Sequence, residues 1–299
     1  MAFPSPKPIP DKDFEFITYP GAPQDSPPIK LKASSTWMCC GPLLHLDGAG
    51  TPEQIDGPQD ASFDAWKEYT LTQDTQHLLL PRLVPFLKAV EEYLVEHGFF
   101  HYWLAIRASK PNHEFDVARW HADENFYNPS ISYQTRGMWK LCTTLQGPGT
   151  LFAVDGDYAR KFLNDAKARG EDRLRRDPTH VCVLVGCGNC GRTTCEIREE
   201  MRDGLADKEV RQSIANKEMV FFRVGGLEGA VHSEPPIDGD RIFINVIPGE
   251  PGQLMELTER WGMPYPRAWS LGVPLVFGGD EERNNSRFKT AVNGGFRGR

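Results

Sequence analysis

The amino-acid sequence predicts a mainly β fold with added helices. Short runs of aromatic and β-branched residues, bounded by Gly, Pro and Asn, recur from residue 99 to residue 247. The predicted strands are 99–108, 115–123, 138–146, 150–154, 218–224, 229–233 and 241–247. One long segment with helical spacing precedes them, so a single antiparallel sandwich or barrel with helices added to it is expected.

The chain before the predicted strands divides into an arm and a helix. Residues 1–60 hold many of the 24 prolines, which predicts a Pro-rich, extended N-terminal arm without catalytic groups. From residue 74 to 97, apolar residues recur at the spacing of an α-helix. Asp74 is expected to cap the start of this helix and Gly98 its end.

One charged segment interrupts the predicted strands. Residues 155–216 are rich in Arg, Asp, Glu and Lys and contain helical patterns at 158–168 and 196–206. We expect a helical, charged insertion between strands of a single domain that spans residues 61–279. The tail, residues 280–299, is expected to be flexible.

Composition excludes several classes of function. The 299 residues carry 34 basic and 41 acidic side chains, a formal charge of -7, whereas nucleic-acid binding requires a concentrated basic face. No stretch approaches the roughly 18 consecutive apolar residues that span a membrane. The proline-rich start lacks the apolar region of a secretory signal, and the seven cysteines are an odd number. A cytoplasmic protein with reduced thiols is therefore expected.

Two histidines and one aspartate are candidate metal ligands. His121 and Asp123 lie two residues apart in R-W-H-A-D-E-N, so on a strand both side chains point to the same face and reach one ion. His232, in V-H-S-E-P-P, follows 109 residues after Asp123 (232 − 123). Two His and one carboxylate on one face form the facial triad of non-haem Fe(II) oxygenases, whose other face is open to a co-substrate and dioxygen.

Arg241 strengthens this interpretation. It lies nine residues after His232 (241 − 232) and begins the predicted strand R-I-F-I-N-V-I. A hairpin that turns through Pro235, Pro236 and Gly239 is expected to place Arg241 beside the strand of His232. A buried guanidinium there is suited to a bidentate bond with a carboxylate.

The order H-x-D, distal His and then a nearby Arg resembles the Fe(II)/2-oxoglutarate-dependent oxygenases, over about half of the chain. This resemblance implies a double-stranded β-helix core of the jelly-roll or cupin-like type. It also implies that His121, Asp123 and His232 bind Fe(II), and that Arg241 binds the distal carboxylate of the co-substrate 2-oxoglutarate. Decarboxylation of 2-oxoglutarate to succinate and carbon dioxide, with dioxygen, then drives hydrogen abstraction from a small-molecule substrate.

A narrower resemblance rests on R-W-H-A-D-E-N, W-K-L-C-T-T-L-Q-G-P-G-T and V-H-S-E-P-P, which are similar to segments of fungal oxygenases that close an aziridine ring on valine in secondary metabolism. It implies an amino-acid substrate whose carboxylate pairs with a cation. Arg119, Arg136 and Arg107 are candidates for that cation because they lie near the H-x-D motif. A surface charge is the simpler interpretation of each.

Aromatic and hydroxyl side chains near the motif complete the candidate site. Trp139 is expected to form a wall of the substrate site, although core packing explains it almost as well. Either Thr143 or Thr144 places a hydroxyl near the co-substrate, and spacing does not decide between them.

Two other functions remain open. A cupin-like metal-dependent dioxygenase or isomerase would use the arginine to bind its substrate and would not use 2-oxoglutarate. A non-enzymatic protein would hold zinc at C-G-N-C-G-R-T-T-C, where Cys187, Cys190 and Cys195 lie close together and Cys182 or His180 completes the site. Reduced loop cysteines are the simpler interpretation. The sequence does not predict the substrate, the type of product or the oligomeric state.

Overall fold

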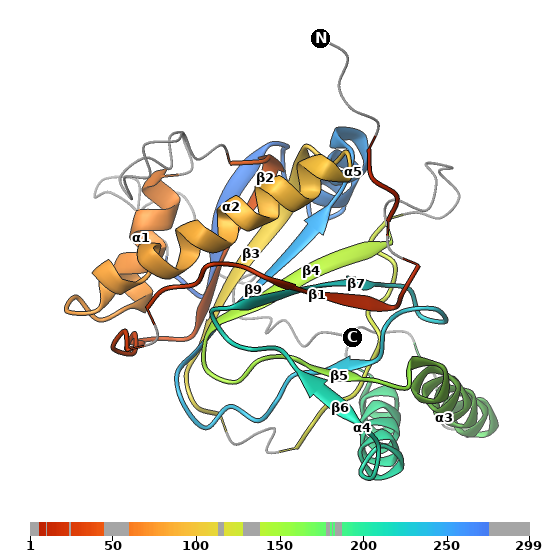
Figure 1. Cartoon of the computed structure of the whole chain (residues 1–299). Coiled ribbons are helices and arrows are strands. Elements are labelled where there is room, and N and C mark those ends of the chain that lie inside the picture. The colour runs from red at the N-terminus through yellow and green to blue at the C-terminus, as the bar shows by residue number, and fades with distance from the viewer. Residues whose placement is uncertain are drawn as a thin grey trace, which may run out of the picture.

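A computed structural model describes residues 6–9, 11–23, 25–44, 60–112, 117–127, 138–177, 180, 182 and 187–274. These residues form two antiparallel sheets with helices outside them (Figure 1). In chain order the elements are β1 (Phe14–Thr18), β2 (Ser35–Pro42), α1 (Asp60–Thr70), η1 (Gln76–Leu78), α2 (Leu80–Glu96), β3 (His101–Ser109), β4 (Trp139–Gln146), β5 (Leu151–Ala153), α3 (Gly156–Arg176), α4 (Gly188–Gly204), β6 (Val210–Gln212), β7 (Glu218–Arg223), β8 (His232–Ser233), β9 (Arg241–Pro248), α5 (Pro251–Glu259) and β10 (Arg267–Leu271).

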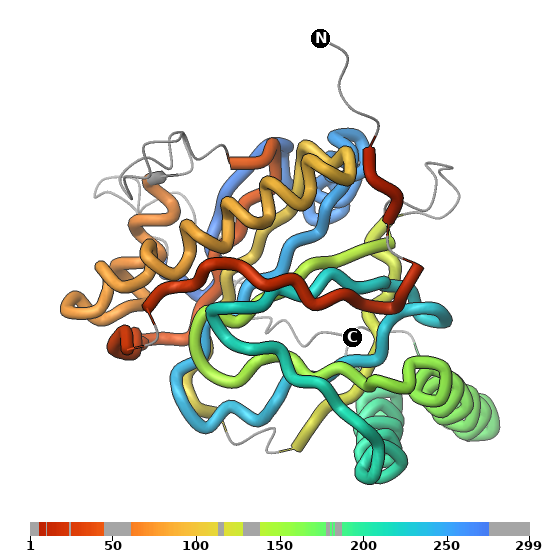
Figure 2. The backbone as a smooth tube through the Cα atoms, viewed as in Figure 1, coloured from red at the N-terminus to blue at the C-terminus, as the bar shows by residue number. Residues whose placement is uncertain are grey.

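The larger sheet has seven strands in the order β1-β7-β4-β9-β3-β2-β10, and its neighbours are all antiparallel. Strands that are far apart in the sequence therefore lie side by side, as β1 and β7 do (Figure 2). Successive side chains of a strand point to opposite faces. On β4, Leu141 belongs to the core beneath the helices, whereas Cys142 belongs to the core between the sheets.

The smaller sheet has three short strands in the order β6-β5-β8. His121 extends it through an isolated antiparallel bridge to His232, the first residue of β8. A core that includes Phe152, Phe222 and Phe243 separates this sheet from the larger one. His232 stacks on Phe152 with 5.6 Å between the ring centroids, so one predicted metal ligand is fixed against that core.

Helices α1 and α2 cover the other face of the larger sheet (Figure 1). The buried apolar positions of α2 follow the helical period: Leu83, Phe86, Leu87, Val90 and Leu94. Full burial of a side chain of this size contributes about 1.5–3 kcal/mol.

The helix predicted at 74–97 is confirmed in η1 and α2, with a different start. Asp74 precedes the short 3-10 helix η1 and does not cap α2. Gly98 ends α2 as predicted, because its φ of 79° lies in the left-handed region that glycine adopts without strain. The N–H of Phe99 then bonds to the carbonyl of Leu94 at 2.8 Å, which closes the last turn.

Helices α3 and α4 lie between β5 and β6, two strands that pair with each other. Where the helices meet, a Cβ on Gly170 would lie 2.7 Å from Thr193 Cγ2, so only glycine allows this approach. Their apolar faces form a third core with the smaller sheet, in which Leu163 and Met201 join Val231. The helical patterns predicted within 155–216 are thus confirmed, and the interpretation of this segment as an insertion stays a prediction.

Two predicted features of the strands are wrong. The chain from His232 to Arg241 does not pair as a hairpin, because β8 belongs to the smaller sheet and β9 to the larger one. Pro235 and Pro236 have no N–H group to continue a ladder beyond β8, and the chain crosses between the sheets there. The strand predicted at 115–123 is, among the described residues 117–127, a single bridge at His121.

The N-terminal part of the chain is extended where the structure describes it. Strands β1 and β2 fall within residues 1–60 and pair with β7 and β3. The domain limits at residues 60 and 279 stay predictions, and the tail 280–299 lies outside the described residues. Within the described part of the chain, no helix combines the length and apolar character needed to cross a bilayer.

Candidate metal centre

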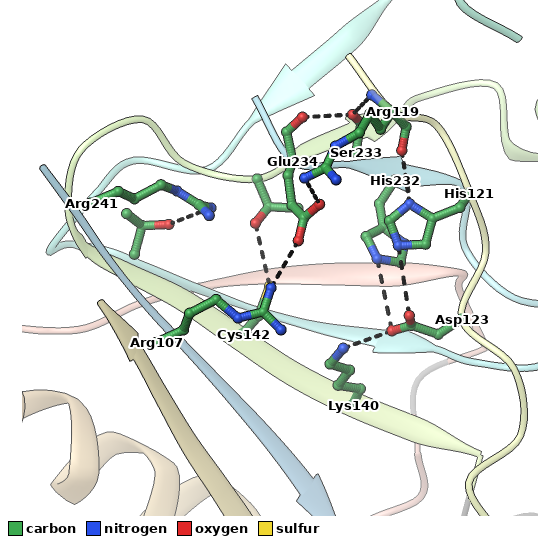
Figure 3. A network of polar contacts seen from close by, with 12 residues as sticks. Arg107, Arg119, His121, Asp123, Lys140, Cys142, His232, Ser233, Glu234 and Arg241 are labelled. Atoms are coloured by element: carbon green, nitrogen blue, oxygen red, sulfur yellow. Dashed lines mark hydrogen bonds and ion pairs between the residues drawn. The ribbon is translucent and has the colours of Figure 1, made fainter. Parts of the chain in front are cut away.

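His121 and His232 are joined through their backbones. Each donates its N–H to the carbonyl of the other, and both distances are 2.9 Å. Side chains directly opposite each other in an antiparallel pair project to the same face. The two imidazole rings accordingly lie with their centroids 4.4 Å apart (Figure 3).

Asp123 completes a group of three candidate ligands. Its carboxylate oxygens lie 3.7 Å from His121 Nε2 and 3.8 Å from His232 Nε2. One donor atom from each of the three residues lies within 4.8 Å of the other two, which is close enough to hold one metal ion. The structure therefore brings together the residues that the H-x-D motif and the distal histidine predicted.

Both imidazoles are oriented by backbone carbonyls. His121 Nδ1 lies 2.8 Å from the carbonyl oxygen of Arg119, and His232 Nδ1 lies 3.0 Å from that of Ala230. A carbonyl only accepts hydrogen bonds, so Nδ1 carries the proton in each ring. Nε2 is then left with its lone pair directed at Asp123, which is the tautomer that a metal-binding histidine requires.

Charge and burial keep His232 and Asp123 in their metal-binding protonation states. Burial lowers the pKa of His232 to about 4, and the neighbouring His121 lowers it too, so His232 is neutral at pH 7. Burial raises the pKa of Asp123, but Lys140 and the two imidazoles outweigh this effect, and its pKa lies below the usual range. Two imidazoles and one carboxylate, with no sulfur, match the donor set of non-haem iron sites.

Lys140 is a polar neighbour that the sequence analysis did not identify. Its Nζ lies 2.8 Å from Asp123 Oδ2, and both side chains are largely buried. The ammonium also lies over the rings of Phe126 and Phe222. A lysine within a strand that also carries Trp, Leu and Cys was the only signal in the sequence, and it does not reveal the partner.

The residues that alternate with the ligands point away from the centre. Trp120, Ala122 and Val231 are buried in the core formed with α3 and α4. One face of this short bridge therefore presents the ligands, and the other is packed against a pair of helices.

Arg241 lies between the two sheets at the start of β9 and is only 2% exposed. Its Nε donates to the carbonyl of Pro148 at 2.9 Å, and Nη2 lies 3.4 Å from Thr144 Oγ1. No ion pair joins it to any carboxylate among the described residues. Burial lowers the pKa of Arg241 to about 10, so the guanidinium remains charged at neutral pH.

Of the two threonines, only Thr144 faces Arg241. The hydroxyl of Thr143 donates to the carbonyl of Glu218 and contacts Tyr19 on the opposite face of β4. The side-chain alternation of the strand decides a choice that the sequence left open.

Glu234 occupies the space between Arg241 and the histidines (Figure 3). It forms ion pairs with Arg119 at 2.6 Å and with Arg107 at 3.3 Å. Burial raises the pKa of Glu234, but the neighbouring positive charges, of which Arg119 has the largest effect, lower it by more. The net shift is downward, so Glu234 is ionised. Two of the predicted substrate cations thus share one carboxylate of the chain.

The other predicted substrate residues are placed differently. Trp139 lies on the helix-facing side of β4, where it stacks on Phe221 with 4.8 Å between centroids, and it is not brought to the metal centre. Arg136 lies outside the described residues.

The chain has little similarity to known proteins. No family model and no curated protein matches the chain. Two solved structures of the non-haem iron oxygenase OrfP are similar to part of it, one in complex with Fe, succinate and (3R,4R)-dihydroxy-L-Arg (15% identity, TM-score 0.21) and one with Fe and L-Arg (14%, 0.22). Each match covers 48% of this chain and 54% or 55% of the other. The chain thus spans about half of the matched proteins, and TM-scores this low do not establish a shared fold.

Proposed function

We propose that the protein is a non-haem Fe(II)- and 2-oxoglutarate-dependent oxygenase that acts on a small amino-acid-like substrate. The convergence of His121 Nε2, His232 Nε2 and a carboxylate oxygen of Asp123 carries this proposal. The tautomer of both rings supports it further, because the carbonyls of Arg119 and Ala230 leave each Nε2 free to coordinate. A bound Fe(II) ion, with 2-oxoglutarate and dioxygen, would supply the oxidant that removes hydrogen from the substrate.

The strand order supports a double-stranded β-helix. Four strands of the larger sheet, β3-β9-β4-β7, face the smaller sheet β6-β5-β8, to which His121 is bridged. From β3 onward the chain alternates between the two sheets through β3, His121, β4 and β5, passes from β5 to β6 within the smaller sheet, and then alternates again through β7, β8 and β9. This interpretation accounts for ligands at the edge of one sheet and Arg241 in the other.

A buried cation without a carboxylate partner supports 2-oxoglutarate as co-substrate. Within the described residues, Arg241 has hydrogen bonds to Pro148 and Thr144 but no ion pair. A buried charge is unfavourable unless it is paired, so the free edge of the guanidinium is suited to an incoming carboxylate. We propose that it holds the distal carboxylate of 2-oxoglutarate, with the hydroxyl of Thr144 beside it.

The ion pairs of Glu234 support a substrate with a carboxylate. Arg107 and Arg119 present two guanidinium groups beside the metal centre, and both are paired with Glu234. A substrate carboxylate that replaces Glu234 would gain the same two partners.

The narrower proposal is ring closure on valine: valine, 2-oxoglutarate and dioxygen would give the aziridine, succinate, carbon dioxide and water.

Reconstitution without oxygen tests the metal and the co-substrate together. We expect the protein to develop the weak visible charge-transfer band of the Fe(II)–2-oxoglutarate chelate, and then to release succinate when oxygen and a set of amino acids, valine included, are added. His121→Ala should abolish both signals. His77→Ala, a change at an exposed histidine on η1, is the matched control and should retain them. Undiminished turnover by His121→Ala would contradict the proposal, and mass analysis of the valine product tests ring closure.

A cupin-like dioxygenase or isomerase that does not use 2-oxoglutarate is the second candidate. The negative charge of Glu234 favours this second candidate. It raises the pKa of Arg241 and so opposes the effect of burial, which means that part of the charge of Arg241 is already balanced without 2-oxoglutarate. In this case Arg241→Ala weakens the binding of the substrate itself, and 2-oxoglutarate has no effect on turnover.

A further inference from the structure

A second cluster of metal-binding side chains lies away from the centre described above. His180, Cys182, Cys187 and Cys190 each place one donor atom within 4.8 Å of the others. Cys190 Sγ lies 3.5 Å from Cys182 Sγ and 3.3 Å from His180 Nε2. The cluster shares no residue with the candidate iron centre, and the inference does not rest on the oxygenase function.

These distances are close to those of a tetrahedral site. Zinc lies about 2.3 Å from thiolate sulfur and about 2.0 Å from imidazole nitrogen, so around one ion two sulfurs lie about 3.8 Å apart and a sulfur and a nitrogen about 3.5 Å apart. Each measured separation is within about 0.3 Å of these values. A disulfide between Cys182 and Cys190 requires sulfurs about 2.05 Å apart and leaves the imidazole unexplained.

We propose that His180, Cys182, Cys187 and Cys190 bind one structural zinc ion. Three thiolates and one imidazole are a closed set of four ligands, which is the composition of structural rather than catalytic zinc sites. Cys187 and Cys190 have the two-residue spacing of such sites, and Cys187 lies at the N-cap of α4. Cys195, the third cysteine of the C-x-x-C stretch, is exposed and outside the cluster.

The position of the ligands gives the ion a structural task. His180 and Cys182 follow the end of α3, and Cys187 and Cys190 begin α4, so zinc closes the connection between the helices. Farther along, the helices pack at Gly170 and Thr193, and the ion pairs Arg169–Glu200 and Arg173–Glu196 that also join them are exposed and contribute little in water. The order of these pairs makes the helices antiparallel, as expected of two helices whose near ends are tied by one ion.

Metal content and Co(II) spectra test the site in the full chain. The measurements use a His121→Ala/Asp123→Ala background, so that the candidate iron centre does not take up the probe metal. We expect about one zinc per chain after purification under reducing conditions, and Co(II) in its place should show thiolate charge-transfer and intense tetrahedral bands. Cys190→Ser should lose the zinc, whereas Cys195→Ser, a change on the same helix outside the cluster, should keep it.

The proposal is overturned if the background protein binds no zinc, if its Co(II) complex lacks thiolate bands, or if Cys182 and Cys190 are found as a disulfide. It is also overturned if Cys190→Ser retains full zinc. Should Cys190→Ser fail to fold, the Co(II) spectrum of the background protein still decides the question, and His180→Ala provides a second variant. Zinc binding in a protein without iron-dependent turnover would leave this inference intact and remove only the proposed function.

Discussion

Lys140 places a positive charge 2.8 Å from a carboxylate oxygen that we propose as an iron ligand. The pair stabilises the metal-free protein, because Asp123 is largely buried and would otherwise have only the two imidazoles as partners. A divalent cation bound by the carboxylate would take over this role, and the ammonium would then repel the ion.

Lys140→Met is therefore expected to destabilise the metal-free protein by about 3 kcal/mol. Addition of Fe(II) or Mn(II) should raise the melting temperature of the variant by more than it raises that of the wild type, because the metal replaces the lost charge. Differential scanning calorimetry with and without metal measures both effects. Lys161→Met, at an exposed lysine of α3, is the control. A metal-induced shift in Lys140→Met no larger than that of the wild type would contradict this account.

Arg241 gives a second prediction for a single residue. Arg241→Lys keeps a positive charge but loses the planar fork that bonds a carboxylate at two points. The lost charge-assisted hydrogen bond corresponds to about 1.5–3 kcal/mol, so the KM for 2-oxoglutarate should rise by about 10- to 100-fold. Fe(II) affinity, measured by titration without co-substrate, should stay unchanged. An unaltered KM for 2-oxoglutarate would favour the cupin-like alternative.

Single residues show which parts of the candidate site could be predicted from the sequence. His121, Asp123 and His232 were predicted because ligand chemistry permits few residue types, and the two-residue spacing within the motif restricts their geometry. Lys140 and Glu234 were not, because each acts through a partner that is distant in the sequence. Trp139 was predicted to face the site, but the register of β4 turns it to the helices.

Among the elements, α3 and α4 pack against the backbone that carries the candidate metal ligands. Their core includes Trp120, Ala122 and Val231, which alternate with the candidate ligands along the chain. Displacement of either helix would therefore move the backbone that carries His121 and His232.

Gly170→Leu should disturb this packing. A side chain at this position meets Thr193 and Ile197 of α4, so the helices must separate, at a cost of about 1–3 kcal/mol. Ala168→Leu adds the same side chain on the exposed face of α3 and should change the free energy of unfolding by less than about 0.5 kcal/mol. Chemical denaturation compares the two. Equal stability of both variants would show that the helices do not pack as described.

At the level of elements, the sequence predicted central strands better than peripheral ones. Strands β4, β7 and β9 are largely buried on both faces and β3 on one, and all four contain closely spaced apolar residues. Strand β6 is short and exposed, and β10 is short and largely half-buried, so neither shows such a run. The hairpin between β8 and β9 was wrong because spacing alone does not reveal that two strands belong to different sheets.

Across the whole molecule, burial of tyrosine hydroxyls contributes to the response to high pH. Burial raises the pKa of five tyrosines among the eight in the chain: Tyr19, Tyr93, Tyr102, Tyr127 and Tyr265. The value is about 12 for Tyr19 and Tyr265. In the unfolded chain these groups ionise near pH 10. The stability that these buried hydroxyls contribute is thus fully present below about pH 10 and is lost as the pH rises toward 12.

Tyr19→Phe should make this loss less steep. Between pH 9 and pH 11 the wild type should lose about 1 kcal/mol more than the variant, which has one fewer hydroxyl to ionise on unfolding. Urea denaturation at several pH values measures the slope, and the slope rather than the absolute stability is compared, because the variant also lacks the contact to Thr143. Parallel pH profiles would contradict the expectation.

The division of the molecule into two sheets also affects how its backbone opens locally. His121 and His232 are carried by the smaller sheet, whereas Arg241 begins β9 in the larger one. A co-substrate bound to the iron at one end and to Arg241 at the other would connect two sheets that the chain joins only through loops. Amide hydrogen exchange in β8 and β9 would then slow together when 2-oxoglutarate binds, and the two sheets would open as one cooperative unit rather than separately.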